Sequence, residues 1–267
     1  GLAGDALTEG SSNVAIGYGA MSSANGTESR NIAIGQFALF QLNDNGNNYN
    51  TAVGYAAGET ITTGIKNTLI GGNAGDALTT GAGNVAIGYQ ALSSEDANGY
   101  NTAVGYRALL TLNAGKDAYN TAVGYDAGVN LSSGAYNVIM GSLAGDALTT
   151  GDYNIAIGFE ALSTEAGYSH NVAIGGYALK TQDAGADAYN IAIGYNAGYY
   201  MTTGVTNVIM GGNAGLALTS GSDNIAIGYA ALSTEDVRGR CIAIGTSALS
   251  SQNAGANTYN VAIGYNA

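Results

Sequence analysis

Basic residues are scarce in this chain, and so are the residues from which catalytic and metal sites are usually built. Seven lysines and arginines stand against nineteen aspartates and glutamates among 267 residues, giving a formal net charge of −12. That balance cannot neutralise a phosphate backbone, which argues against nucleic acid as a partner. The single histidine, His170, leaves no Ser-His-Asp set and no metal-binding cluster. We therefore expect no enzyme activity, no cofactor and no bound metal.

Proline and tryptophan are absent, cysteine occurs once, and long apolar runs are missing. The lone Cys241 cannot form an intrachain disulfide. Without a run of about 18 apolar residues, no membrane insertion is expected in this segment. Charged residues make up only 10% of the chain and apolar residues 46%, which argues against disorder. The chain also begins and ends inside a repeat, which predicts part of a longer array or a filament subunit.

A short motif, Asn-Val-Ala-Ile-Gly-Tyr-x-Ala, dominates the sequence and is complete at residues 84–91. We name its first residue the anchor and count positions from it. The anchor returns every 17 to 19 residues, and all fifteen copies have Gly at +4 and Ala at +7. A short apolar strand restarted at this period predicts an all-β fold, a parallel β-solenoid. Cys241 is one anchor, and the others are Asn13, Asn31, Asn50, Asn67, Asn84, Asn101, Asn120, Asn137, Asn154, Asn171, Asn190, Asn207, Asn224 and Asn260.

The anchor spacings form a larger unit of four coils. From Asn84 the spacings are 17, 19, 17 and 17, so Asn84, Asn154 and Asn224 are each 70 residues apart. We number the coils of this super-repeat first to fourth, starting at Asn84. No linker or shift in composition interrupts the array, so we predict a single continuous solenoid over residues 1–267. The second coil carries two extra residues, and its turn at 113–117 should protrude.

Side chains alternate between two faces of each predicted strand. Positions +1 and +3 carry branched residues that favour strands, whereas +2 is usually Ala and +4 is Gly. We expect the branched face to form the interior of the coil. The flat Ala/Gly face should admit another backbone, either the opposite side of the same coil or a neighbouring chain.

Every coil carries a large apolar residue on its return side, and the position of this residue changes after every second coil. First and second coils have Leu or Met at +8, whereas third and fourth coils have Gly at +8 and a large apolar residue at +11, as in Ile61 and Leu78. Close packing of a narrow core would require this alternation.

The anchor asparagines are expected to stack into a structural ladder, with Cys241 as a small buried member. Glu95-Asp96 and Glu235-Asp236 are predicted to be solvated corners, too far apart to form a catalytic carboxyl pair. Tyrosines form two lengthwise rows, at +5 and at −1, which should stack. These rows are also possible contact surfaces, because tyrosine makes adaptable contacts with proteins and sugars. Their members include Tyr55, Tyr89, Tyr106, Tyr125, Tyr195 and Tyr229 at +5, and Tyr49, Tyr100, Tyr119, Tyr136, Tyr153 and Tyr189 at −1.

The repeated Asn-[Val/Ile/Thr]-Ala-[Ile/Val]-Gly-x-x-Ala pattern, as in Ala86-Ile87-Gly88 and Ala91, resembles the head repeats of trimeric autotransporter adhesins. It is also similar to β-helical repeats in phage tail-fibre shafts. The resemblance implies a left-handed parallel β-roll, usually of three chains around an axis, which is exposed outside the cell or virion and used for adhesion.

These observations predict a structural subunit or shaft segment of an extracellular fibre. Its partners would be copies of itself, joined by end-to-end stacking or as a parallel trimer. The alternative is an adhesin or tail-fibre receptor-binding module that recognises cell-surface glycans. A local cluster that breaks the repeat would favour this alternative, and none is evident in the sequence.

Overall fold

The computed structural model describes residues 2–267 except 25, 236, 238 and 254–258. Every regular element among them is a strand of three residues that occupies positions +1 to +3 after an anchor. The strands are β1 (Val14–Ile16), β2 (Ile32–Ile34), β3 (Thr51–Val53), β4 (Thr68–Ile70), β5 (Val85–Ile87), β6 (Thr102–Val104), β7 (Thr121–Val123), β8 (Val138–Met140), β9 (Ile155–Ile157), β10 (Val172–Ile174), β11 (Ile191–Ile193), β12 (Val208–Met210), β13 (Ile225–Ile227), β14 (Ile242–Ile244) and β15 (Val261–Ile263).

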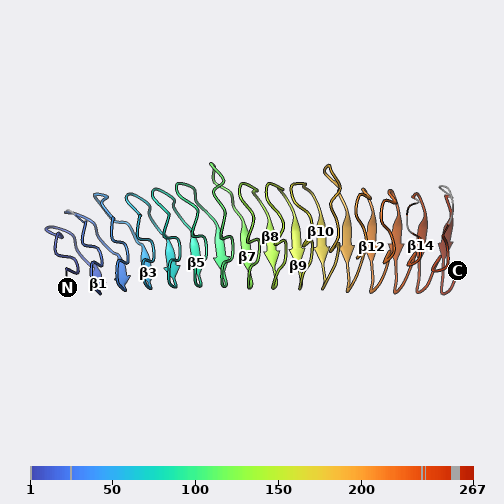
Figure 1. Ribbon diagram of the computed structural model, residues 1–267, viewed down its shortest axis with the longest axis horizontal. Helices are drawn as coiled ribbons and strands as arrows, with labels where there is room; N and C mark the ends of the chain where they lie inside the picture. Colours follow the sequence, from blue (N-terminus) through green and yellow to red (C-terminus); the bar gives the residue numbers. More distant parts are fainter. Residues whose placement is uncertain (1, 25, 236, 238, 254–258) are drawn as a thin grey trace. The chain divides into compact units, whose positions relative to one another are not determined.

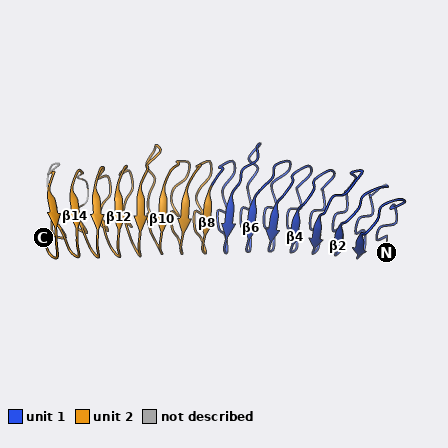
Figure 2. Cartoon of the chain, turned by 180° about the vertical axis from the view of Figure 1, so that it is seen from behind, with its two compact units in different colours: residues 1–136 blue, residues 137–267 orange. Residues whose placement is uncertain are grey.

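The chain divides into two compact units, residues 1–136 and residues 137–267 (Figure 2). In the first unit β1 to β7 pair in chain order, and in the second β8 to β15 do the same, always in parallel. The register is constant, so that Ala15 pairs with Ala33 and Ala86 with Ala103. Each unit is therefore a parallel β-solenoid, which confirms the predicted fold class. Continuity of the array across residues 136 and 137 stays a prediction.

The glycine at +4 ends every strand because no other residue fits there. Gly105 has φ +140°, and a Cβ on it would lie 2.1 Å from the carbonyl oxygen of Gly124 in the next coil. Gly88 stands in the same relation to Gly105, at 2.2 Å. Both the left-handed conformation and the lack of space exclude a side chain. The close backbone approach is thus to the next coil of the same chain, not across the coil or to another chain as expected.

The prediction for the two strand faces was wrong, because the structure reverses them. Ala86 and Ala103 at +2 are fully buried, whereas Val85 and Ile87 on either side are partly exposed. At the first strand Ile16 is 57% exposed. In first, second and third coils the interior holds only an alanine at +2, since larger residues already fill the rest of it. The branched residues at +1 and +3 consequently form an outer surface.

Large residues fill +8 or +11 inside the coil as the sequence predicted, although two second coils fill both positions. Leu92 at +8 and Leu78 at +11 are fully buried, and Leu109 and Leu112 are both buried in one second coil. Fourth coils differ further, because Leu69, Ile139 and Ile209 replace alanine at +2. The Cδ1 of Leu69 would lie 2.6 Å from a Cβ on Gly58, and its Cδ2 2.8 Å from one on Gly75. The two glycines at +8 therefore make room for one leucine.

The turn of the second coil protrudes, as its two extra residues predicted. Residues 113 and 115–117 are exposed, and residues 183 and 185–187 repeat the pattern in the second unit. Figure 1 shows one such loop in green before β7 and another in yellow after β10.

Candidate functional site

The anchor asparagines hold the corner at which each strand begins. Asn84 Oδ1 accepts the backbone N–H of Asn101 at 2.9 Å, and its Nδ2 donates to the carbonyl of Asn98 at 2.9 Å. One side chain thus joins its coil to the next and also closes its own coil. The same Oδ1-to-N–H bond recurs along the ladder within each unit, as in Asn67 to Asn50 and Asn171 to Asn154, both 2.9–3.0 Å. These bonds run from side chain to backbone, so the ladder is structural.

Cys241 occupies an anchor position within this ladder. Its side chain is fully buried, and its backbone N–H donates to Asn224 Oδ1 at 3.0 Å. Gln252 Nε2 lies 3.0 Å from its sulfur. These contacts place the thiol inside the coil as a small buried residue.

Tyrosines at −1 form a stacked row. Tyr100 and Tyr119 have ring centroids 5.1 Å apart and planes inclined by 2°, and Tyr119 and Tyr136 are 5.6 Å apart at 5°. In the second unit His170 takes one place in the row, between Tyr153 at 5.4 Å and Tyr189 at 4.8 Å. The imidazole therefore replaces a tyrosine ring as a stacking partner.

The row at +5 stacks only in part. Tyr89, Tyr106 and Tyr125 form a regular stack with centroids 5.7 and 5.3 Å apart. In the second unit Gly176 and Gly212 interrupt the row, and the rings of Tyr195 and Tyr229 lie over these glycines. Among the described residues, the ring that Tyr195 meets is that of Tyr177, which stands at +6 and not in the row. The expectation that the tyrosines at +5 stack on one another therefore fails around Tyr195.

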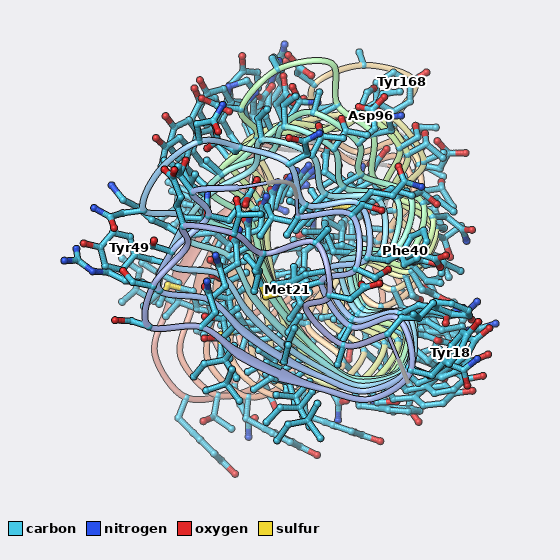
Figure 3. The ribbon with its side chains drawn as sticks, turned by 90° about the vertical axis from the view of Figure 1, so that its left-hand side faces the viewer. Tyr18, Met21, Phe40, Tyr49, Asp96 and Tyr168 are labelled. Carbon is cyan, nitrogen blue, oxygen red and sulfur yellow. The ribbon has the colours of Figure 1, made fainter. Side chains whose placement is uncertain are left out.

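The two rows border the outer strand face on both sides. Figure 3 shows Tyr18, which follows β1, and Tyr49, which precedes β3, at separate corners of the coil, with Met21 in the interior. The rings are about half exposed. Arginines reinforce the rows, because the guanidinium of Arg30 lies 5.3 Å from the Tyr49 centroid and that of Arg240 lies 5.7 Å from the Tyr259 centroid. The outer face is thus an aliphatic strip between aromatic borders.

An aromatic cluster in the second unit breaks the repeat. Tyr177 lies edge-on to Phe159 at 5.3 Å and to Tyr195 at 5.8 Å, while Tyr199 and Tyr200 meet at 4.6 Å and 71°. The rings come from the turns after β9, β10 and β11. Together with Lys180, Asn196 and Leu216, four of these tyrosines line a cavity of about 410 Å³. This cluster was not predicted from the sequence, although Tyr199-Tyr200 has no counterpart 70 residues earlier, where Val129-Asn130 stand.

The prediction of solvated acidic corners was wrong for the glutamates, since Glu95 and Glu235 are fully buried, as is the equivalent Glu165. Asp96 is exposed as predicted, and Asp236 lies outside the described residues. Each glutamate stands at +11, the position that Leu78 fills in a fourth coil. Counting from the anchor would have revealed their inward direction.

Burial raises the pKa of two of these acids, Glu165 and Glu95. Desolvation raises the pKa of Glu165 to about 7, and it also raises that of Glu95 despite hydrogen bonds from Asn98. Asn98 donates both its Nδ2, at 2.8 Å, and its backbone N–H, at 3.2 Å, to Glu95 Oε1. Equivalent glutamates are 70 residues, or four coils, apart along the sequence. No two of them therefore form a catalytic carboxyl pair.

Within the described part of the chain, no group of three or more His, Cys, Asp or Glu side chains could hold a metal ion. The described residues also contain no helix, hence none long and apolar enough to cross a membrane. No family model matches the chain, and no curated protein or solved structure is significantly similar to it. The likeness to adhesin heads and tail-fibre shafts therefore rests on the motif and on the β-solenoid fold.

Proposed function

We propose that this chain is a structural subunit or shaft segment of an extracellular fibre, in which parallel copies pack side by side through their outer strand faces. One observation carries the proposal: the branched residues at +1 and +3 point outward instead of into the coil. A surface of this kind gains free energy when it leaves water, roughly 25 cal/mol per Å² of apolar area.

The second unit presents the clearest version of this surface. Each of its eight strands, β8 to β15, places two Val, Ile or Met residues outward, and no threonine or charged residue interrupts them. At a strand spacing of about 4.8 Å this ribbon is roughly 34 Å long. Apolar patches of this extent on soluble proteins usually mark an interaction surface. In the first unit four threonines at +1 make the strip less apolar.

A second copy of the same chain is the partner that this face fits best. The strip repeats every coil, so an identical strip matches it in period along its whole length. The bordering tyrosines supply rings that remain half exposed and can cover the edges of such a contact. The motif's likeness to adhesin heads supports an arrangement of three parallel chains, and it also supports a location outside the cell or virion.

Sedimentation analysis of the purified chain tests this proposal. We expect the wild type to form a defined multimer, and Ile174→Asp, which places a charge on the strip at β10, to dissociate it. Ala186→Asp adds the same charge to the exposed turn after β10 and should leave the assembly intact. Far-UV circular dichroism checks that both variants fold. A monomeric wild type, or equal assembly of the two variants, would refute side-by-side packing.

A further inference from the structure

The cavity lined by Tyr177, Tyr195, Tyr199 and Tyr200 departs from the 70-residue repeat at nearly every position. Seventy residues earlier the chain has Arg107 in place of Tyr177, and Leu110 in place of Lys180. Val129, Asn130 and Asp146 stand where Tyr199, Tyr200 and Leu216 line the cavity. The edge-to-face contacts of Tyr177 with Phe159 and Tyr195 recur in the first unit, where Phe37 meets Tyr18 and Tyr55 in the same way. Tyr199, Tyr200 and Lys180 do not recur at the equivalent positions of other coils, so these three residues are not required by the fold.

The tyrosine rings that line the cavity are tilted against one another and do not form a continuous stack. Tyr177 and Tyr199 are tilted by 58° with centroids 6.0 Å apart, and Tyr199 and Tyr200 meet edge to face. Tyr195 and Tyr200 are each more than half exposed. This leaves ring faces and hydroxyl groups open toward a cavity of about 410 Å³, within the range of small-ligand sites.

The polar groups of the cavity are placed for hydrogen bonding without net charge. Lys180 Nζ lies 2.5 Å from Glu160 Oε2, and 5.0 and 5.6 Å from the ring centroids of Tyr177 and Tyr199. The chain's own ammonium thus already occupies the aromatic faces that would otherwise attract a cationic ligand. Asn196 donates to Asn213 at 3.1 Å, but its buried Oδ1 receives no hydrogen bond. Such an unsatisfied acceptor at a cavity wall favours a ligand with hydroxyl donors.

We propose that this cavity is a binding subsite for a neutral pyranose sugar. The C–H faces of a pyranose pack against the negative faces of aromatic rings, and its hydroxyls can pair with the tyrosine hydroxyls, Lys180 and Asn196. The paired charges of Lys180 and Glu160, together with the chain's net charge of −12, disfavour an anionic ligand. Side-by-side assembly is not needed for this site, so the two proposals stand independently.

The chain supplies its own matched variants for the test. Tyr199→Val/Tyr200→Asn recreates the Val129-Asn130 pair, which this fold already accommodates in the equivalent coil. Lys180→Leu/Glu160→Gln recreates Leu110 and Gln90 in the same way, and provides a second variant if the first does not fold. Tyr125→Ala is the control, because it removes a ring from the coil position of Tyr195 at a place without the cavity.

Saturation-transfer NMR with methyl glycosides of glucose, galactose, mannose and N-acetylglucosamine measures binding, with tetramethylammonium as a cationic probe. We expect at least one glycoside to bind the wild type and the Tyr125→Ala variant alike, and to bind either matched variant about tenfold more weakly or not at all. Absence of glycoside binding to the wild type would overturn the proposal. Equal weakening by Tyr125→Ala, or a preference for tetramethylammonium, would also overturn it.

Discussion

The buried glutamates are acidic side chains that the fold removes from water and encloses in the interior of the coil. Glu165 accepts the N–H of Tyr168 through Oε1 at 3.3 Å, while its buried Oε2 has no hydrogen-bond partner. Burial of an ionised carboxylate with so few donors is costly, so the folded chain favours the protonated acid. Its raised pKa of about 7 expresses this preference. Asp76 shows the same effect, since burial raises its pKa to about 6.

This preference makes stability depend on pH in a defined direction. Glu165 has a pKa of about 7 in the folded chain against 4.5 as the ordinary value, so the folded state binds more protons between these limits. The contribution of Glu165 to the free energy of unfolding is therefore fully present below about pH 4.5 and is lost as pH rises through 7, a change of at most about 3 kcal/mol. Urea titrations at pH 5 and pH 8 measure the change. Glu165→Gln should flatten the dependence, and a slope identical to that of wild type would contradict this account.

Single positions show which parts of the structure were predictable from the sequence. The period of the motif specifies where strands begin, because only a short strand followed by Gly fits a 17-residue coil. Alternation alone says that Val85 and Ile87 share a face, but it does not say which face points inward. That depends on the space left by Leu92 on the return side, which admits only Ala86. The inward direction of Glu95 follows from its place at +11, although its acidic character suggested solvent.

At the scale of the coil, a large side chain at one interior position is combined with a small residue at another. A fourth coil combines Leu69 at +2 with Gly75 at +8, whereas a second coil combines Ala103 with Leu109. Both combinations are fully buried. Gly75 has φ +55° and Leu109 has φ +51°, so the backbone at +8 is the same in both coils. Leucine at +2 of a fourth coil therefore excludes leucine at +8 both of that coil and of the third coil before it.

Substitutions that exchange the large residue Leu69 and the small residue Gly75 should have strongly non-additive effects on the free energy of unfolding. Gly75→Leu alone would place its Cβ 2.8 Å from Leu69 and Leu78, and we expect a loss of about 1–3 kcal/mol from overpacking. Leu69→Ala alone should cost about 2–5 kcal/mol. The double variant recreates the second-coil pattern, so we expect it to lose less than the sum of the single changes by about 1–3 kcal/mol. Denaturant unfolding of all four proteins gives this difference, and strict additivity would exclude volume exchange.

At the scale of the molecule, each unit is built from contacts between successive coils. Strand pairing and the asparagine ladder both join a coil to the one before it and the one after it. Stability in such arrays is close to a sum of repeat and neighbour terms. For the stability of such an array, the order of the four coil types should then matter more than the number of coils.

Removal of residues 154–223 tests this property within the second unit. The deletion joins Tyr153 to Asn224 and preserves the order of coil types, because Asn154 and Asn224 are equivalent anchors. We expect the circular dichroism per residue to match the full chain and unfolding to stay cooperative. A deletion of residues 154–162, which breaks the phase within a coil, should instead disrupt the second unit. Equal disruption by both deletions would show that coils of one type are not interchangeable.

The whole chain also shows where prediction from the repeat ends. Fold class and coil order follow from the repeated residues, since these recur wherever the backbone has the same needs. The cavity around Tyr177 and Tyr199 depends on Tyr199, Tyr200 and Lys180, which do not recur at the equivalent positions of other coils, and their assembly becomes visible only when neighbouring turns are placed side by side. The search for function in such a chain is therefore a search for departures from its period.

The stacked tyrosines also give this protein an unusual optical property. Because tryptophan is absent, all of its near-ultraviolet emission comes from its nineteen tyrosines. Rings as close and as nearly parallel as Tyr100, Tyr119 and Tyr136 can pass excitation along the row before they emit. The folded ladder is thus a path for excitation energy, and loss of the stack interrupts this path.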